Sequence, residues 1–321
     1  MNNLSAFFNA MPNAASQGLI WGIMAIGLYI TFKILELSDL TVDGSFCTGG
    51  AVCAVMMYEG YTVWIAMPVA FLAGAIAGAI TGFLHTKCKI PAILAGILTQ
   101  LSLWPINLTI MGIASGRPIE SYLALSSRKF DVLVGSSFVQ TVPAGMKPWF
   151  YHPLLTMGLM TLAVVGLLYW FFGTERGCSI RATGANEHMA RAQGINTNAN
   201  KMLGLMLANG LVALAGSLFT QFQGFATIDM GSGAIVNGLA AIVIGDVLFG
   251  KLFKNFALKL ISVSLGAVIY FSIIQAVLDL ADIDSNYLKL SSALVVVIFL
   301  TVSNLMPGKK FHKVRKEAQH A

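Results

Sequence analysis

Long apolar runs separated by short polar stretches dominate the pattern of this chain. A helix needs about 20 predominantly apolar residues to cross the roughly 30 Å hydrocarbon layer of a membrane. The runs predict about nine transmembrane helices, at approximately 15–35, 44–58, 62–84, 91–114, 151–173, 202–222, 231–250, 257–278 and 289–306. We therefore predict an all-α polytopic membrane protein with a single transmembrane domain over residues 1–321.

The second run, 44–58, is the shortest, and a helix of its length rises only about 22 Å. A non-helical segment should complete that crossing, which makes the span discontinuous. The sequence TVDGSFCTGGAVCAV from Thr41 resembles TIDMGSGAIVNGLAAIV from Thr227, with Gly44 matching Gly231. Because the two copies enter the membrane from opposite sides, we interpret them as parts of an inverted repeat that flanks a solute path.

Composition supports a lipid environment. Hydrophobic residues make up 56% of the chain and charged residues 11%, with a mean hydropathy of +0.76. A soluble domain carries about 25% charged residues, so no soluble core would absorb this apolar surface. The cysteines lie in apolar or basic segments, a distribution that argues against a disulfide framework.

The distribution of Lys and Arg predicts the orientation. Fifteen of the 20 basic residues lie in segments that nine crossings place on one face, namely 33–43, 85–90, 174–201, 251–259 and 307–321. The positive-inside rule makes that face cytoplasmic. The N-terminus is then outside, the loop 115–150 is external and the basic tail 307–321 is inside. We interpret this tail as an anchor against anionic lipid rather than a nucleic-acid site.

Small and amide residues inside the predicted spans suggest where helices pack. Gly74, Gly78 and Gly82 recur every four residues and share one helix face. That face lets another backbone approach, either within the chain or across a dimer. The amides of Asn107, Asn209 and Asn237 should face the bundle interior or a wet cavity, as links between helices or as solute contacts.

The loop 174–201 contains signals for a short helix. Asn186 is a good N-cap, Glu187 and Arg191 form an i, i+4 pair, and Gly194 suits the left-handed position after a helix. We predict a two-turn helix over 187–193. So short a helix needs a supporting surface, supplied by a partner protein or by the chain's own bundle.

This loop carries a family resemblance. Its sequence IRATGANEHMARAQGIN resembles the ATPase-docking segment of ABC importer permeases of the branched-chain amino acid and simple-sugar group. The matching positions, with Arg191 beside them, are Arg181, Gly184, Asn186, Glu187, Ala190, Gly194 and Ile195.

A second motif supports the resemblance, which extends from about residue 15 to 306. The segment at residues 39–45 is similar to the group's Ile-Asp-Leu-Ser-Val-Gly-Ser signature at Asp39, Leu40, Thr41, Val42, Gly44 and Ser45. Asp43 is inserted, and Glu36-Leu37 replaces the group's usual glycine pair. This form resembles a sister branch whose relatives are associated with amino acids.

The resemblance implies the membrane-spanning subunit of an ATP-driven importer for a small solute, such as an amino acid, in a bacterial cytoplasmic membrane. The expected partners are a second copy of the chain, a cytoplasmic ATPase dimer and an extracytoplasmic solute-binding protein, with no nucleic acid. The chain has no Gly-x-x-x-x-Gly-Lys-Ser/Thr loop, so we expect it not to hydrolyse ATP. We assign it no catalytic residue, metal or cofactor.

We assign a set of polar and small residues to the solute path or its gate, namely Asp39, Thr41, Asp43, Gly44, Ser45, Asn107, Asn209 and Asn237. Asp39 and Asp43 should lie at the cytoplasmic mouth of the second span, where they cap that helix, gate the path or contact the ATPase. The external acidic residues Asp279, Asp282 and Asp284 contact the binding protein or are merely solvated.

Two other classes of protein remain as alternatives. A secondary transporter also uses inverted repeats and broken helices, but it needs no capped cytoplasmic helix, and Asp246 is the only acidic residue within a late span. A structural or receptor protein does not account for nine spans with polar residues inside them.

Overall fold

The computed structural model describes residues 2–116, 118–125, 153–250, 252–253 and 255–281, with isolated positions between 293 and 301. Its elements are α1 (Asn2–Tyr29), a π-helical turn η1 (Ile30–Ile34), α2 (Val42–Tyr58), α3 (Val63–Thr86), α4 (Ala92–Ser115), β1 (Tyr122–Ala124), α6 (Pro153–Gly173), α7 (Glu175–Ala185), α8 (Glu187–Ala192), α9 (Thr197–Gln223), β2 (Phe225–Thr227), a 3-10 turn η3 (Ile228–Gly231), α10 (Ala234–Phe249) and α11 (Phe256–Ala281).

The predicted all-α membrane fold is confirmed. Seven helices among the described residues are long and apolar enough to cross a membrane, and they match seven of the predicted spans. The predicted span at 44–58 corresponds to the shorter α2, which follows a non-helical stretch over residues 35–41. Most of the predicted span at 289–306 lies outside the described residues, so the count of nine is approximate.

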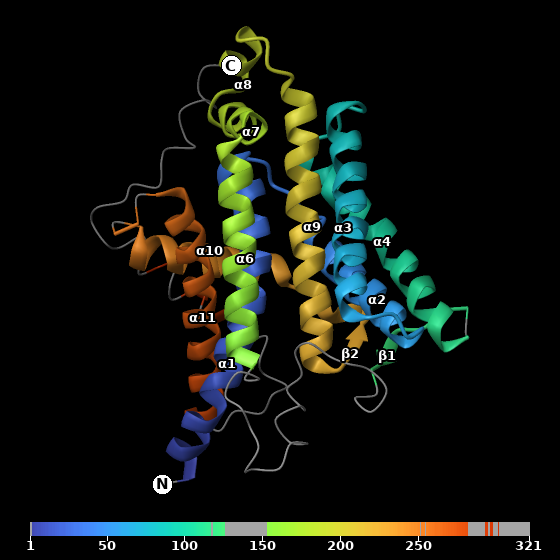
Figure 1. The fold of residues 1–321 in the computed structure, drawn as a ribbon, viewed down its shortest axis with the longest axis vertical. Helices are drawn as coiled ribbons and strands as arrows, with labels where there is room; N and C mark the ends of the chain where they lie inside the picture. Colours follow the sequence, from blue (N-terminus) through green and yellow to red (C-terminus); the bar gives the residue numbers. More distant parts are fainter. Residues whose placement is uncertain are drawn as a thin grey trace.

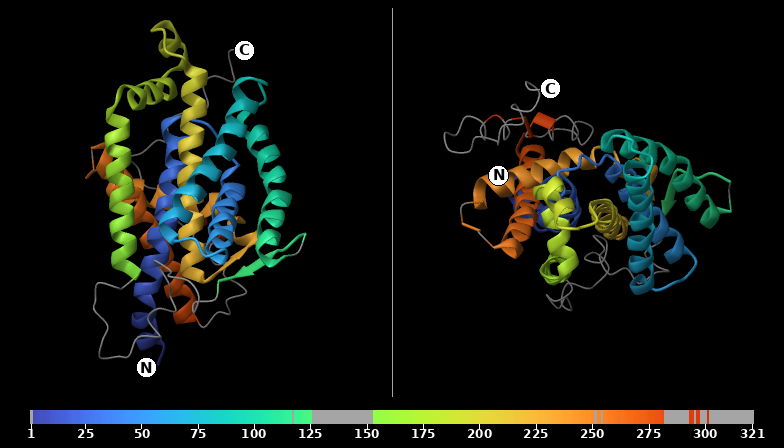
Figure 2. Two further views of the ribbon diagram at one scale, coloured as in Figure 1. Left: turned by 45° about the vertical axis from the view of Figure 1, so that its right-hand side comes forward. Right: turned by 90° about the horizontal axis from the view of Figure 1, so that it is seen from above.

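Helix α9 lies at the centre of the bundle, between α1 on one side and α2 and α3 on the other (Figures 1 and 2). Its large apolar side chains meet those of α1 and α2, where Trp21 stacks on Phe46 at 5.1 Å between ring centroids and meets Phe219 edge-on. The opposite flank is formed by α1, α10, α11 and α6. Apolar side chains on the outer faces of α3, α4 and α6 are exposed, as expected of a surface in contact with lipid.

The glycine face of α3 packs against α9 of the same chain. A Cβ atom at Gly78 would collide with the carbonyl oxygen of Leu205, and one at Gly74 with that of Asn209. Gly82 lies against Met202, one turn further along. The spacing of four residues therefore serves an approach of two backbones within the chain.

A small two-stranded sheet lies at the end of the bundle opposite α8 (Figure 1). Strand β1 pairs antiparallel with β2, and Leu123 faces Ala226 in the register. The first strand belongs to the predicted external loop 115–150, of which the described part ends at residue 125. Helical periodicity carries no signal for such three-residue strands, so the sequence analysis did not predict them.

Candidate functional site

A buried carboxylate lies at the centre of a polar network inside the bundle. One oxygen of Asp39, Oδ1, accepts a hydrogen bond from the Thr41 backbone N–H at 2.9 Å, and Oδ2 accepts one from the Asn209 side chain at 2.7 Å. The side-chain oxygen of Asn209, Oδ1, in turn accepts a hydrogen bond from the Ser45 hydroxyl at 2.7 Å. The network joins the 35–41 segment, α2 and α9, so three residues that the sequence analysis selected from distant positions meet in one place.

Asp39 does not lie at the cytoplasmic mouth where the sequence placed it. Its side chain is 1% exposed and contacts Asn209, which lies in the middle of α9. The reason is that the chain after η1 turns back into the bundle before α2 begins, so the signature segment is enclosed. The hydrogen bond to the Thr41 N–H places this carboxylate at the N-terminus of α2, the capping role that the sequence analysis considered.

Three threonine hydroxyls extend the buried polar region toward α3 and α4. Thr41 and Thr81 approach to 2.8 Å, and Thr81 donates to Thr99 at 3.0 Å. The sequence analysis did not select Thr81 or Thr99. The proximity of Thr81 to the glycine face of α3 is the signal that would have found it, since residue 81 lies one turn after Gly78.

The Asp43 carboxylate caps a helix that lies 190 residues further along the chain. It accepts hydrogen bonds from the backbone N–H groups of Gly233 at 3.3 Å and Ile235 at 3.1 Å, at the start of α10. The N-cap of α10 is Gly233 in the left-handed conformation, with no side chain to cap the helix itself. Capping of its own helix was one of the roles predicted for Asp43, but its side chain caps α10 instead, the helix after the segment that resembles its own in sequence.

The two segments that resemble each other in sequence also touch. A Cβ atom at Gly231 would collide with the backbone carbonyl of Asp43, so η3 lies directly against the first turn of α2. Gly50, further along α2, lies against the Met230 side chain. This close approach places the starts of α2 and α10 side by side.

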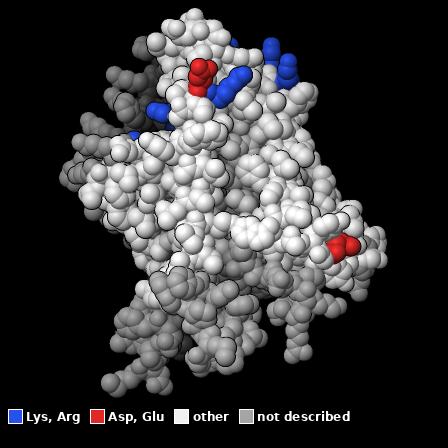
Figure 3. Space-filling view, in the orientation of Figure 1, with Lys and Arg blue, Asp and Glu red and all other residues white. Residues whose placement is uncertain are grey.

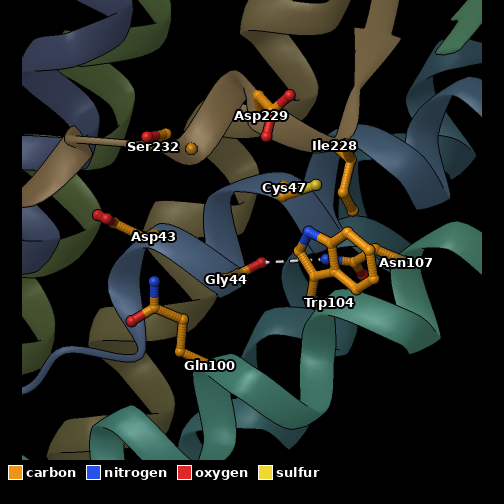
Figure 4. Close-up of a pocket in the computed structure, with 10 residues that line it drawn as sticks. Asp43, Gly44, Cys47, Gln100, Trp104, Asn107, Ile228, Asp229 and Ser232 are labelled. Atoms are coloured by element: carbon orange, nitrogen blue, oxygen red, sulfur yellow. Dashed lines mark hydrogen bonds between the residues drawn. The ribbon is translucent and has the colours of Figure 1, made fainter. Parts of the chain in front are cut away.

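A cavity of about 210 Å³ lies between α2, α4 and η3 (Figure 4). Residues of η3 and the turn after it form one wall, residues of α4 form the opposite wall, and the first turns of α2 lie between them (Figure 4). The lining residues are Asp43, Gly44, Cys47, Gln100, Trp104, Asn107, Ile228, Asp229, Gly231 and Ser232.

Asn107 is the buried amide of this cavity, and Asn237 lies elsewhere. The Asn107 side-chain NH₂ donates to the Gly44 carbonyl at 3.4 Å, whereas its Oδ1 has no hydrogen-bond partner among the described residues. Asn237 accepts the Tyr270 hydroxyl at 3.0 Å and so links α10 to α11. The predicted path residues thus fall into the Asp39 network, the cavity and this separate interhelical contact.

A second candidate site is formed by α7 and α8 at one end of the bundle (Figure 1). Helix α8 spans Glu187–Ala192, close to the predicted 187–193. The Asn186 side chain caps it by accepting the Met189 N–H at 3.0 Å, Gly194 has φ +79°, and the Ile195 N–H returns to the Ala190 carbonyl at 3.0 Å. All the predicted capping residues therefore occupy their expected positions.

Glu187 is held by three neighbours. Its carboxylate pairs with Arg191 at 2.6 Å and with Lys201 at 2.7 Å, and it accepts the Thr197 hydroxyl at 3.3 Å. The hydrogen bond from Lys201, together with the charges of Lys201 and Arg191, lowers the pKa of the Glu187 carboxyl below its ordinary value. The group is therefore ionised at neutral pH and fastens α8 to the start of α9.

Helix α7 was not predicted from the sequence. Thr174 caps this helix by accepting the Gly177 N–H at 3.4 Å, and its eleven residues occupy the first half of the 174–201 loop. Glycines at its ends allow close packing, since a Cβ atom at Gly184 would collide with the Ile34 carbonyl at the end of η1. The sequence of the helix, ERGCSIRATGA, is too short and too polar for a membrane span, so a search for long apolar runs passes over it.

The residues that the sequence predicts to dock the ATPase differ in burial, and Arg181 is among the exposed ones. Ala190 is buried against the bundle, Gly184 lies on η1, and the Arg181 guanidinium lies 5.5 Å from the centre of the Phe256 ring. Asn186, Arg191 and Gly194 are exposed, and Ile195 is half-buried. Met189, which the sequence analysis did not select, is 63% exposed on the same short helix.

The chain matches known transport permeases over most of its length. A family model described as "Branched-chain amino acid transport system / permease component" matches residues 10–303. A tyrosine transport system permease protein from Clostridioides difficile is 36% identical over 290 residues, 90% of each chain. A ribose import permease protein from Haemophilus influenzae is 27% identical, covering 93% of this chain and 86% of the relative.

A solved structure shares the fold. A chain of the structure "PsaBC from Streptococcus pneumoniae in complex with Fab" superposes with a TM-score of 0.52 at 19% identity, covering 94% of this chain and 96% of that one. At this identity the likeness concerns the fold alone. The family match across residues 10–303 and the 36% identical relative together show that this multi-pass membrane protein belongs to the permease component family of branched-chain amino acid transport systems.

Proposed function

We propose that this chain is the membrane-spanning subunit of an ATP-driven importer whose solute is an amino acid. The observation that carries the proposal is helix α8, which is capped at both ends and fastened by Glu187 to Lys201 in a chain of the permease family. The bundle itself supports this six-residue helix through Glu187 and the buried Ala190, and the exposed Met189 on it offers an apolar contact to a partner.

The charge distribution supports a cytoplasmic position for α8. Lys and Arg side chains on the face shown in Figure 3 gather at the end that carries this helix. The N-terminus of α1 lies at the opposite end of the bundle (Figure 1). In this proposal the ATPase binds at the α8 end, and the solute-binding protein docks at the end that carries β1 and β2.

The relatives support the choice of an amino acid as the solute. The tyrosine permease relative is 36% identical to this chain, whereas the ribose import permease relative is 27% identical.

We further propose that two copies of the chain form the transport path. The acidic residues Asp282 and Asp284, which we assigned to the binding-protein contact, lie outside the described residues, as does the side chain of Asp279.

A continuous set of contacts links α8 to the polar interior. Helix α8 follows α7 directly, Gly184 of α7 lies on the Ile34 carbonyl of η1, and the segment after η1 carries Asp39 into contact with Asn209. We propose that movement of the ATPase reaches the starts of α2 and α10 through these contacts. Since Asp43 joins the two helices by hydrogen bonds, they would move together.

A double variant of α8 tests the proposal. Glu187→Arg places a third cation beside Arg191 and Lys201, and Gly194→Val forces a β-branched residue into a left-handed conformation. We expect the variant to fold but to lose co-purification of the ATPase and ATP-driven uptake in reconstituted vesicles. Glu59→Arg, a charge reversal at the exposed end of α2 and away from α7 and α8, is the control and should retain ATPase co-purification. Normal ATPase binding and uptake by the double variant would refute the proposal.

A further inference from the structure

The cavity between α2, α4 and η3 is rich in hydrogen-bond acceptors. Two of its ten lining residues, Asp43 and Asp229, are carboxylates, and none of the ten is Lys, Arg or His. Asn107 is 1% exposed, and its side-chain oxygen has no hydrogen-bond partner among the described residues. Since buried polar atoms are normally paired, this oxygen points to a donor that enters from outside the chain.

The depth of the cavity indicates that its open side faces water. Gln100, Trp104 and Asn107 lie about 12, 18 and 23 Å along α4, a helix about 36 Å long. The same cavity is lined by Asp229, whose side chain is exposed. A carboxylate exposed near the middle of a membrane does not face hydrocarbon, because an ionisable group there faces the bundle interior or a water-filled cavity.

We propose that this cavity is a subsite for the primary ammonium group of the transported solute. The inference rests on the proposed importer function and deepens it, since it names the group by which the permease itself recognises the solute. An ammonium group offers three N–H donors, and the residues that line the cavity supply the Asp229 carboxylate and the unpaired Asn107 Oδ1 as acceptors. Trp104 lies on the α4 wall of the cavity, across from Asp229 on η3, and presents an aromatic ring that attracts a cation (Figure 4).

The size and the ligand set favour an ammonium group over a metal ion. A volume of 210 Å³ equals about seven water molecules at roughly 30 Å³ each, which suits the head group of an amino acid. Both oxygens of Asp43 already accept backbone hydrogen bonds from the start of α10. The described residues contain no cluster of three or more His, Cys, Asp and Glu side chains suited to a metal.

Equilibrium binding to the full chain in lipid nanodiscs tests the subsite. The probe is radiolabelled L-tyrosine, and the competitors are tyramine, which keeps the amine, and 3-(4-hydroxyphenyl)propionate, which lacks it. We expect tyramine to compete and the deaminated acid not to compete. Asp229→Asn should weaken L-tyrosine binding by about tenfold or more, the loss expected when a charged hydrogen bond is removed. Glu59→Gln, an exposed change at the end of α2, should bind like the wild type.

Several results would overturn the subsite. They are equal competition by the deaminated acid, wild-type affinity in Asp229→Asn, displacement of L-tyrosine by Mn²⁺ or the absence of saturable binding. Failure of the subsite is distinguishable from failure of the proposed function. ATP-driven uptake of L-tyrosine by Asp229→Asn with wild-type affinity would leave the importer standing and refute the subsite. Amine binding by a chain that recruits no ATPase would support the subsite and refute the importer.

Discussion

At the scale of single residues, the sequence identifies polar residues that need partners but does not show which of them contact the buried Asp39. The types of residue were informative for Asn107, Asn209 and Asn237, because amides inside apolar spans need partners. The pairing of Asp39 with Asn209 could not be predicted, because the two residues are 170 positions apart and meet only when α2 packs on α9. Glu36 shows the same limit. It adopts φ +54°, a left-handed conformation that favours glycine and that its residue type does not predict.

A double-mutant cycle tests the Asp39–Asn209 contact. Asn209→Leu removes the donor to Asp39 and the acceptor of the Ser45 hydroxyl, so it should destabilise the chain by about 3 kcal/mol. The Asp39→Leu/Asn209→Leu pair should cost less than the sum of the single changes, with a coupling of about 1–3 kcal/mol. Thermal unfolding in detergent measures each variant. Additive effects would show that the two side chains do not stabilise each other.

The Glu187 contacts predict a dependence of α8 on pH. The pKa of this carboxyl is lowered in the folded chain, so its stabilising effect is complete above the unfolded pKa and is lost as pH falls through the folded pKa. We expect hydrogen exchange at the Ala190 N–H, which bonds to the Asn186 carbonyl, to accelerate in acid relative to a Glu187→Gln variant at the same pH. An equal ratio of exchange rates at pH 7 and pH 4 would contradict this prediction.

At the scale of elements, the sequence predicted what local chemistry controls. The cap of α8, the short α2 and the glycine face of α3 each follow from residues within a few turns of one another. The capping of α10 by Asp43 and the pairing of β1 with β2 join segments about 100 to 190 residues apart. No helical period or cap signal encodes these contacts, which arise from the packing of the bundle.

The contact between α3 and α9 predicts a large effect at Gly78. Leucine there would push against the Leu205 carbonyl in a packed interface, so Gly78→Leu should destabilise the chain by about 3 kcal/mol or prevent its folding. Gly166→Leu on α6 is the matched control, because no atom lies within 4 Å of a Cβ added at that position. Yield and melting temperature in detergent compare the two. Similar behaviour of both variants would mean that the glycine face of α3 is not packed.

At the scale of the whole molecule, apolar run length was enough to predict the class of fold and most of the spans. It was not enough to place the cavity, because Trp104 and Gln100 have no pattern of their own in the sequence, and the repeat that contains Asp229 does not show what that residue faces. They come together because α10 is preceded by η3, which lies against the first turn of α2. The arrangement of the cavity thus depends on how these two segments meet, which neither segment encodes alone.

The orientation of the molecule can be tested with its native cysteines. Cys88 follows α3 and Cys178 lies on α7, and both are exposed, whereas Cys47 and Cys53 are buried within α2. The positive-inside rule places the two exposed cysteines in the cytoplasm, together with Gln319 in the basic tail, and places Ser5 outside.

An impermeant thiol reagent should therefore leave Cys88 and Cys178 unlabelled in intact cells and label both in inside-out vesicles. In a background where these two are replaced by serine, Ser5→Cys should react only from outside and Gln319→Cys only from inside. We expect this contrast because the basic residues are unevenly distributed, with fifteen of 20 in the segments assigned to one face. Labelling of Cys88 or Cys178 in intact cells would place α8 outside the cell, where no ATPase could reach it.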